Sequence, residues 1–409
     1  MRVAIVTHVV RHNDGQGRVN HEIARAALEA GIGVTLVASH VAPELLAHPN
    51  VRWAAVKIGR WWPTNLLRQQ VFAFKSARWL RAHRHEYDVL HVNGFITWMR
   101  ADVNTSHFVH SGWLGSKYYP FGLTKGVWSA YQSIYTRCNA VLERWAYRRS
   151  KVITAVSQKV ADEIHAIGLT PDNRVDVIYN GVDTQGFAAA SGDRARFDLP
   201  AEAFLLLFVG DLRTPRKNLG TVLAALKHLP EHVQIAVAGY LPGSPYPEQA
   251  KALGIAHRVH FLGLVKDMPV LMHAVDAFVF PSRYEAMSLS LLEAMAAGLP
   301  VVTARTAGGA EIITPDCGIV LDDPDDPQAL AGAVARLAGD DTARRAMGDA
   351  ASRLATGFGW ARMAAQYIAL YRQLAGQQEN RRRSDANASA AAQNDALTLN
   401  HLAGQKRVK

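Results

Sequence analysis

The sequence predicts an α/β protein in which two doubly wound domains face each other across a central cleft. Short, β-branched apolar runs alternate with helical stretches, and this pattern stops near residue 180 and restarts near residue 204. Strands that are apolar at nearly every position are typical of parallel sheets covered on both faces by helices. A polar segment of small residues, 180–203, separates the two halves. Because ligands of such sheets bind beyond the carboxyl ends of the strands, the cleft is the expected site.

Five apolar runs in each half predict the strands. Those of the first half are 3–9, 33–39, 87–92, 151–157 and 175–179. Those of the second half are 204–210, 233–239, 258–263, 276–281 and 299–304. Helices of the first half are expected at 18–30, 65–84, 125–149 and 157–167. Strands that alternate with helices of this length predict parallel sheets built by right-handed crossovers. We therefore expect an N-terminal domain at 1–185 and a C-terminal domain at 186–358.

Two segments follow the second domain. Apolar residues recur at helical spacing in 359–375, which predicts a C-terminal helix with one buried face. Residues 376–409 are rich in Gln, Asn, Ala and Ser and contain no aromatic residue. Such a composition buries too little apolar surface to offset chain entropy, so we expect a disordered tail.

The composition narrows the class of protein. The chain has 409 residues, of which 49% are hydrophobic, and is therefore an ordinary globular sequence. No apolar run reaches the roughly 18–20 residues that a membrane-spanning helix needs. The two cysteines, Cys138 and Cys317, lie too far apart for a disulfide framework or a Cys-rich zinc site. These features predict a protein of the reducing cytoplasm.

Charge is unevenly distributed between the halves. Residues 1–185 hold 22 Lys and Arg against 13 Asp and Glu, a net charge of +9, whereas the remainder holds 23 against 22. Eight of the nine tryptophans also precede residue 150. Such asymmetry indicates that the two domains meet different partners and that the first meets an anionic surface.

Residues 60–85 combine basic and aromatic side chains. The candidates for contact with a membrane are Trp61, Trp62, Arg68, Arg78, Trp79 and Arg81. A basic amphipathic surface with tryptophan anchors suits an anionic bilayer. The alternative is that the apolar residues pack the core and the basic ones are solvated. We therefore expect a cytoplasmic protein that is either free or attached peripherally to the inner face of the cytoplasmic membrane.

Two loops have the features of anion sites. Gly15 and Gly17 lie where the first strand leads into a helix, so backbone N–H groups can approach an anion at the helix N-terminus. Arg213, Arg216 and Lys217 follow the first strand of the second domain, where cations could hold a diphosphate. A tight turn in the first case and a solvated basic loop in the second remain alternative interpretations.

The most informative segment is PSRYEAMSLSLLEAMAAGLPVV, in which Glu285 follows a strand and Glu293 lies eight positions on. It resembles the E-x7-E motif of retaining glycosyltransferases of family 4, which have two Rossmann-like domains in the GT-B arrangement. The resemblance covers residues 1 to about 375. Its other landmarks are GQGR, TAVSQKVADEI, VIYNGVDTQGF, GDLRTPRKN, FLGLVKDMP and TAGGAEII.

The resemblance implies roles for the donor site. Glu293 resembles the glutamate that accepts from the ribose hydroxyls, Glu285 the one beside the donor sugar, and Lys217 the lysine on the diphosphate. The family's phosphate arginine is replaced by Asp211, so Arg213 or Arg216 is expected to substitute for it. The remaining expected donor contacts come from Val265 at the base and from Met287, Ser288 and Leu289 at the phosphates.

The first domain is expected to supply the other side of the site. His107 resembles the family's histidine near the donor sugar, and His110 is the competing candidate. We place His110 and Asn180 on the acceptor side of the cleft. With Glu285 and Lys217, His107 completes the predicted catalytic set.

The same resemblance implies the chemistry. A sugar would pass, with retention, from a nucleotide-diphosphate sugar to a hydroxyl of a glycan or lipid-linked acceptor, as in the synthesis of lipopolysaccharide or another cell-surface polysaccharide. No cofactor and no metal are expected, because cations take the place of a metal at the diphosphate. A nucleotide-sugar 2-epimerase of the same architecture is the alternative. A nucleic-acid binder is suggested only by the sequence pI near 9.6, so no nucleic-acid partner is expected.

Overall fold

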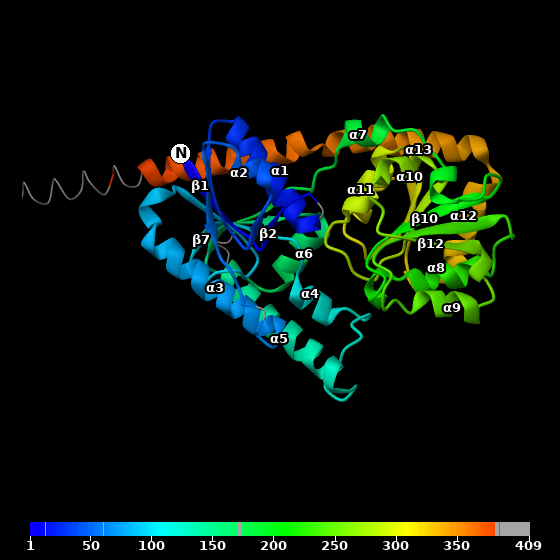
Figure 1. Ribbon diagram of the computed structural model, residues 1–409, viewed down its shortest axis with the longest axis horizontal. Coiled ribbons are helices and arrows are strands. Elements are labelled where there is room, and N and C mark those ends of the chain that lie inside the picture. The colour runs from blue at the N-terminus through cyan, green and yellow to red at the C-terminus, as the bar shows by residue number, and fades with distance from the viewer. Residues whose placement is uncertain (13, 60, 170–173, 381–383, 385–409) are drawn as a thin grey trace, which may run out of the picture.

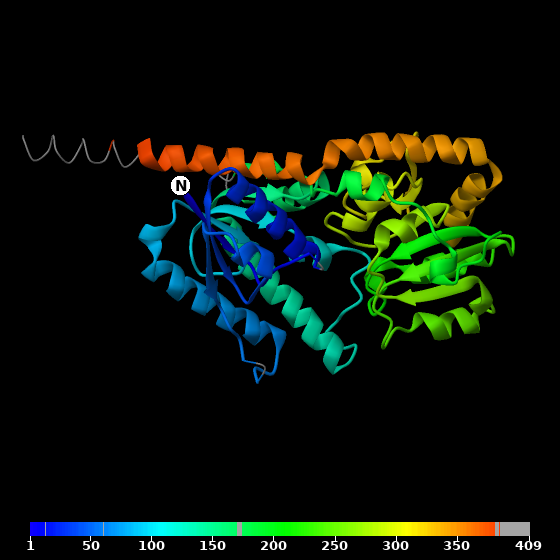
Figure 2. The same ribbon diagram turned by 45° about the horizontal axis from the view of Figure 1, so that its top comes forward.

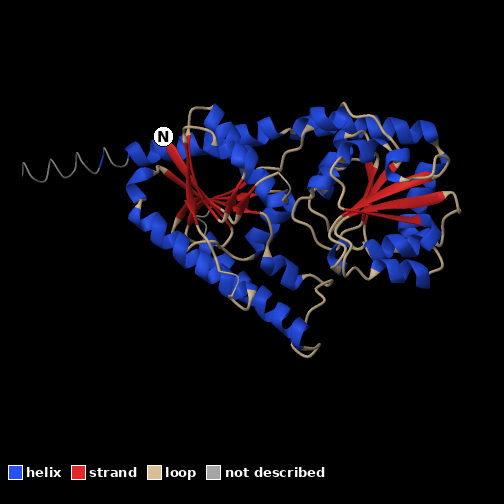
Figure 3. Ribbon diagram, in the orientation of Figure 1, coloured by secondary structure: helices blue, strands red, loops and turns tan. Residues whose placement is uncertain are grey.

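The computed structural model describes residues 1–12, 14–59, 61–169, 174–380 and 384. The chain forms two lobes, each built on a parallel sheet with helices on both faces (Figures 1 and 3). The predicted fold class is thereby confirmed: two doubly wound α/β domains stand on either side of a cleft.

The first sheet has seven strands in the order β5-β3-β1-β6-β7-β8-β9, and all neighbours are parallel. The strands are β1 (Arg2–Val6), β3 (Gly33–Ala38), β5 (Val51–Ala55), β6 (Val89–Asn93), β7 (Ala101–Ser106), β8 (Ser150–Ala155) and β9 (Arg174–Val177). A small parallel pair, β2 (Val9–Val10) and β4 (His40–Val41), lies beyond the main sheet. The chain changes winding direction between β1 and β6, so a crevice opens there at the carboxyl ends of the strands.

The second sheet repeats this arrangement with six strands in the order β12-β11-β10-β13-β14-β15. The strands are β10 (Phe204–Val209), β11 (Val233–Ala238), β12 (Val259–Gly263), β13 (Ala277–Phe280), β14 (Val301–Ala304) and β15 (Gly318–Leu321). Here the winding changes between β10 and β13. The loops that follow these two strands hold Lys217 and Glu285, so the switch point places both residues at one edge.

Helices cover both sheets. Those of the first domain are α1 (Gly15–Glu29), α2 (Pro43–Leu46), α3 (Asn65–Ala82), α4 (His110–Gly115), α5 (Val127–Tyr147) and α6 (Gln158–Ala166). Those that follow are α7 (Thr184–Ala188), α8 (Leu219–Leu226), α9 (Tyr246–Ala252), α10 (Met268–His273), α11 (Leu289–Ala296), α12 (Pro327–Gly339) and α13 (Asp341–Ala355). Among the described residues, none of the helices combines the length and apolar character that crossing a bilayer requires.

The last helix, residues 360–380, returns to the first domain (Figure 2). Its apolar face is buried in the same core cluster as β1 and α1 and contains Met363, Tyr367, Leu370, Tyr371 and Leu374. The Tyr371 hydroxyl lies 2.6 Å from Nδ1 of buried His91 on β6. The helix thus belongs to the first domain's core, and the chain crosses between the lobes twice.

Two predicted boundaries differ from the structure. The helix continues to 380, past the expected start of the tail at 376, and Gln378 Nε2 donates to Asp102 Oδ1 at 2.9 Å. The expected domain boundary at 185/186 falls inside α7, which packs against α10 and α11 of the second domain. The rest of the predicted tail, 381–383 and 385–409, lies outside the described residues.

Candidate functional site

A cavity of about 830 Å³ lies between the two domains and is lined by residues of both. Most of the predicted site residues line it: Gly15, His107, Asn180, Arg213, Lys217, Val265, Glu285, Met287, Ser288, Leu289 and Glu293. These residues come largely from loops at the carboxyl ends of the two sheets, where ligands of such sheets bind. Gly17, His110 and Arg216 were also predicted for the site, but they are not part of the cavity wall.

Glu285 and Lys217 form an ion pair in the second domain's wall, and both side chains are largely buried. Arg216 Nη1 lies 3.3 Å from the same carboxylate oxygen, Glu285 Oε2. Burial alone would raise the pKa of Glu285, but the charges of Lys217 and Arg216 and the Lys217 hydrogen bond hold it below its usual value. Burial lowers the pKa of Lys217, and the attraction of Glu285 only partly opposes this effect. The loop after β10 therefore places positive charge in the cavity wall, and the Glu285 carboxylate holds that charge in position.

Glu293 stands in a different environment, on α11. Burial raises the pKa of its carboxyl to about 7, and the charge of Arg18 from the first domain acts in the opposite direction. Ser288 caps α11, because its side chain accepts from the N–H of Leu291 at 3.2 Å. The helix thus begins at the cavity, with Ser288, Leu289 and Glu293 in its wall. A carboxyl at this position can accept from ligand hydroxyl groups once it is ionised.

The glycine turn forms the opposite wall. Helix α1 begins at Gly15, three residues before the predicted start, because Asp14 caps it by accepting from the Gly17 N–H at 2.6 Å. A Cβ at Gly17 would lie 2.9 Å from Asp14 Oδ1, so glycine permits the cap rather than contacting a ligand. At Gly15, an added Cβ would meet only Leu289 Cδ1, 4.0 Å away in the other domain. The first turn of α1 therefore faces the second domain across a narrow gap.

His107 lies at the end of β7 and lines the cavity. Burial lowers its pKa to about 4, so the ring is neutral at physiological pH. Its Nε2 lies 3.0 Å from Asn93 Oδ1, and Asn93 Nδ2 donates to the Val6 carbonyl at 3.0 Å. This second bond fixes the orientation of the amide, so Nε2 of His107 carries the proton and Nδ1 is left as an acceptor.

His110 is not a second candidate for this position. It is the first residue of α4, its backbone N–H donates to Glu143 Oε2 at 2.8 Å, and its ring faces the same carboxylate. Asn180, by contrast, is buried in the cavity wall, and its Oδ1 has no hydrogen-bond partner in the described structure. Asn180 can therefore accept from a bound molecule.

The two candidate phosphate arginines are placed differently. Arg213 lines the cavity, pairs with Asp211 through Nε at 3.0 Å, and lies over the Tyr240 ring. Arg216 lies behind Glu285 and donates to the Tyr284 carbonyl at 2.9 Å. Of the two, Arg213 has access to a ligand, and Asp211 orients it.

Sequence reasoning assigned no role to Arg18, which lines the cavity from α1. Its Nε donates to Glu22 Oε1 at 2.9 Å, and its guanidinium lies 5.4 Å from the Trp360 ring centroid. The available signal was the position of Arg18 directly after Gly17, because a residue in the first helical turn beside a glycine loop faces the same ligand as the loop.

Further contacts hold the two domains together beside the cavity. The Tyr284 hydroxyl donates to the Val109 carbonyl at 2.8 Å and lies 2.6 Å from Glu163 Oε2. Ser157 Oγ donates to the Ala286 carbonyl at 2.6 Å. These bonds join the E-x7-E segment to α4 and α6, so this loop of the second domain is anchored directly on the first domain.

The basic and aromatic segment 60–85 is only partly available to a membrane. Trp61 is 75% exposed and stacks on Trp62, and Arg68, Arg78 and Arg81 are exposed. Trp79 instead packs against the first domain's core and stacks on His83, with ring centroids 4.2 Å apart. Trp79 is therefore less available to a bilayer than Trp61, because one side of its ring packs on the core.

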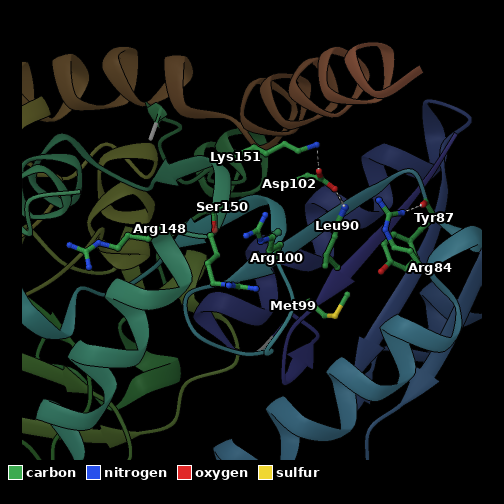
Figure 4. Close-up of a pocket in the computed structure, with 11 residues that line it drawn as sticks. Arg84, Tyr87, Leu90, Met99, Arg100, Asp102, Arg148, Ser150 and Lys151 are labelled. Atoms are coloured by element: carbon green, nitrogen blue, oxygen red, sulfur yellow. Dashed lines mark hydrogen bonds and ion pairs between the residues drawn. The ribbon is translucent and has the colours of Figure 1, made fainter. Parts of the chain in front are cut away.

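A second cavity, of about 450 Å³, lies at the other edge of the first sheet (Figure 4). Its cationic side chains are Arg84, Arg100, Arg148, Arg149 and Lys151, and Asp102 pairs with Lys151 at 2.7 Å. Ala101 and Ser150, the first residues of β7 and β8, line it. Because this is the amino-terminal edge of the strands, the cavity is not where such a sheet holds its substrate.

One group of potential metal ligands occurs in the described part of the chain, although the sequence predicted none. His12, His21 and Glu44 offer ligand atoms that all lie within 4.8 Å of one another. The three residues come from separate segments around the start of α1.

The solved structures that this chain resembles have the GT-B fold. Sucrose-phosphate synthase from Thermosynechococcus elongatus matches with a TM-score of 0.75 and 20% identity, over 91% of this chain and 98% of that one. WaaG, a glycosyltransferase involved in lipopolysaccharide biosynthesis, matches with a TM-score of 0.70 and 21% identity, over 90% and 98%. Anabaena HepE in complex with UDP-glucose matches with a TM-score of 0.68 and 20% identity, over 93% and 100%.

Sequence comparison identifies the family. A profile described as Glycosyltransferase Family 4 matches residues 13–185, and one described as Glycosyl transferases group 1 matches residues 203–340. The chain belongs to these family 4, group 1 glycosyltransferases. The D-inositol 3-phosphate glycosyltransferase of Xylanimonas cellulosilytica is 27% identical over 87% of this chain and 89% of its own length. That of Salinispora tropica is 35% identical, over 48% of this chain and 46% of its own length.

Proposed function

We propose that this glycosyltransferase retains anomeric configuration and moves a sugar from a nucleotide-diphosphate sugar to a hydroxyl of a glycan or lipid-linked acceptor. The observation that supports the proposal most is the meeting of Glu293, the Glu285–Lys217 pair and the Gly15 turn in one cavity. Each group suits one part of a nucleotide sugar: ribose, sugar and diphosphate. HepE, which has a similar fold, was solved with UDP-glucose, and this supports a nucleotide sugar as the donor.

The diphosphate would lie between the two domains. Lys217 and Arg213 supply positive charge from one side, and the N-termini of α1 and α11 supply backbone N–H groups. These groups stabilise the charge that develops on the leaving diphosphate without any bound metal ion. Preorganised donors of this kind, aimed at developing charge, commonly contribute on the order of 2.7–4 kcal/mol each to lowering a barrier.

Retention follows from the order of the steps. The carbon–oxygen bond to the diphosphate breaks first and leaves an oxocarbenium-like centre. The acceptor hydroxyl attacks from the face that the diphosphate leaves, and the departing phosphate oxygen takes the hydroxyl's proton. Glu285 keeps Lys217 directed at the phosphate and faces the sugar. Neutral His107 accepts a hydrogen bond from a sugar hydroxyl through Nδ1. Asn180 Oδ1 accepts a hydrogen bond from the acceptor side of the cleft.

We propose a membrane-associated acceptor, as in the assembly of lipopolysaccharide or another surface polysaccharide. Support comes from the first domain's net charge of +9 and from exposed basic side chains beside exposed Trp61, Leu67 and Phe74. Interfacial basic residues contribute roughly 1 kcal/mol each at an anionic bilayer. WaaG, which has a similar fold, is involved in lipopolysaccharide biosynthesis. Docking through α3 would leave the protein peripheral on the cytoplasmic face.

The test begins with the donor. A thermal-shift screen of the full chain over nucleotide sugars identifies the one that stabilises it by binding the folded state. Release of the nucleoside diphosphate is then followed by chromatography with and without candidate acceptors, and the anomeric configuration of the product is determined by NMR. We expect transfer with retention, which persists in excess chelator. An inverted product would contradict retention, and epimerised donor without acceptor would identify a 2-epimerase instead.

A further inference from the structure

His21 is a buried imidazole whose ring nitrogens make no well-formed hydrogen bond with any described residue. It lies on α1 and is 2% exposed, and its two ring nitrogens lie 3.4 Å from a Glu44 carboxylate oxygen and 3.6 Å from a Glu22 carboxylate oxygen. A buried polar group left unsatisfied costs about 1–3 kcal/mol, so such groups are rare in native structures and call for an explanation.

Other ligand-bearing side chains surround this ring. Glu44 Oε1 on α2 lies 3.4 Å from His21 Nε2 and 3.2 Å from His12 Nε2. The His12 and His21 rings are 3.9 Å apart at their centroids and tilted by 51°. Two imidazoles and a carboxylate, from the loop before α1, from α1 itself and from α2, thus lie in contact, and the exposed His12 ring would turn away from His21 for both to bind one ion.

Two of the three spacings between the ligand atoms are those of a metal site, and all three atoms lie within 4.8 Å of one another. Zinc bonds of about 2.0–2.1 Å place two ligand atoms of a tetrahedral ion roughly 3.3 Å apart. The two distances from Glu44 Oε1 agree with this value. His and carboxylate ligands together are typical of zinc, and three protein ligands leave a fourth position open. His12 and Glu44 are half-exposed, so solvent reaches the group.

A second carboxylate supports His21 from behind. Glu22 Oε1 lies 3.6 Å from His21 Nδ1, on the side of the ring away from Glu44. Arg18 and Arg25 hold this carboxylate in place, with Arg18 Nε at 2.9 Å and Arg25 Nη2 at 3.0 Å. A metal-bound histidine ordinarily directs its other N–H at such a carboxylate, which fixes the ring.

We propose that His12, His21 and Glu44 form a binding site for a zinc-like divalent transition metal, with Glu22 as the outer carboxylate. The ion would join the loop before the glycine turn to α1 and α2, and would thereby restrain the segment that leads into the donor cavity. His12 also lines that cavity, so the site lies at its rim. The ion is separate from the diphosphate chemistry and takes no part in the transfer.

The test is a zinc titration of the full chain, with any affinity tag removed and resident metal removed by chelator and dialysis. Competition with a chromophoric chelator measures affinity and stoichiometry without any donor or acceptor. We expect one tight equivalent in the wild type, and a loss of affinity of about 10–100-fold or more in His12→Ala and in Glu44→Gln. His257→Ala, which removes an exposed histidine paired with Glu231 at 2.9 Å, is the control and should bind as the wild type does.

Cobalt gives a second readout of the same site. Co²⁺ in the wild type should give the visible absorption of a four-coordinate ion, and His12→Ala should lose it. Both test substitutions are at half-exposed side chains, and equal melting temperatures of variants and wild type in chelator would show that the fold is intact. Zinc affinity in the wild type no greater than in the two variants, or an equal loss in His257→Ala, would overturn the proposal.

Discussion

The two walls of the cleft cavity handle charge in opposite ways. The second domain's wall is preassembled: Glu285 holds Lys217, and Asp211 holds Arg213. The first domain's wall includes a neutral His107, held by Asn93, together with Arg18 of α1. The second domain's cations are thus paired with carboxylates of the cavity wall itself, whereas the first domain contributes a neutral imidazole and an arginine that pairs with Glu22 outside the cavity.

Glu293 is the exception in its own wall. Its neighbour Glu285 is held in the charged form by cations, but Glu293 is half-buried in the cavity wall, and among the described residues the charge of Arg18 favours its ionisation. Glu293 thus depends on the first domain and on the ligand for its charge. Substitutions in the two walls separate their contributions.

The largest effect is expected at Lys217. Lys217→Ala removes the positive charge that faces the diphosphate and leaves Glu285 buried without its closest partner. We therefore expect kcat/KM to fall by about 10²–10³. Lys227→Ala, at an exposed lysine just after α8, should leave it unchanged. Both variants are compared in the nucleotide-release assay. Retained activity in Lys217→Ala would mean that the second wall does not act on the leaving group.

Glu293→Gln should weaken donor binding and stabilise the unliganded protein. Loss of a charge-assisted bond costs about 1.5–3 kcal/mol, or roughly 10–150-fold in the dissociation constant. Because the folded pKa is about 7 against a usual 4.5, ionisation destabilises the fold progressively as pH rises from 4.5 through 7. Glutamine removes that cost, which is at most about 3 kcal/mol.

Melting curves and donor titrations of Glu293→Gln at pH 8 check both effects. A variant that is less stable than the wild type at pH 8, or that binds donor equally well, would show that the buried carboxylate is structural rather than a ligand acceptor.

Arg18 tests the influence of the first wall on the second. Arg18→Ala should raise the pKa of Glu293, because the guanidinium favours the charged form. Donor binding should then require a higher pH. Arg25→Ala is the matched control, since Arg25 lies on the same helix and also pairs with Glu22. An equal shift in both variants, measured by donor titration across pH, would assign the effect to Glu22 instead.

The smallest effects concern the membrane surface. Changing Arg68, Arg78 and Arg81 to Glu should abolish sedimentation with anionic vesicles and alter stability by less than about 1 kcal/mol. The same reversal at Lys227, Lys266 and Arg353 of the second domain should leave vesicle binding intact. Binding lost equally in both sets would show that net charge, rather than α3, is responsible.

The two tryptophans of this segment should separate docking from packing. Trp61→Ala should weaken vesicle binding and leave the melting temperature unchanged, because the ring is exposed. Trp79→Ala should lower stability by about 1–3 kcal/mol, because the ring packs on the core. Vesicle sedimentation and melting curves report the two effects, and reversed outcomes would contradict the assignment.

The sequence predicted the parts of the fold that are locally encoded. Strands such as β1 and β10 can be recognised from their continuous apolar runs, because strands covered on both faces do not alternate in polarity. Strands β5 and β15 were missed; both lie at an edge of their sheet, and β5 includes exposed Arg52 and Trp53. Short and edge strands acquire their structure from neighbours that local pattern does not show.

The donor motif was predicted for the same reason, since Glu285 and Glu293 lie eight residues apart on one strand–loop–helix unit. Contacts between distant segments were not predictable. The proximity of His12, His21 and Glu44, which come from three separate segments, leaves no spacing signal in the chain. Of the candidate pairs that sequence left open, Arg213 and His107 line the cavity, whereas Arg216 and His110 do not.

The most direct test of the account is the pH dependence of donor binding by the wild type and by Glu293→Gln. Nucleotide sugars are suitable ligands, because their diphosphate has no ionisation between pH 6 and 8. Calorimetric titration should show that the wild type binds more tightly as pH rises through about 7, where Glu293 ionises, and that the variant binds weakly at every pH. Equal pH profiles for the two proteins would contradict the claim that this carboxylate receives the donor.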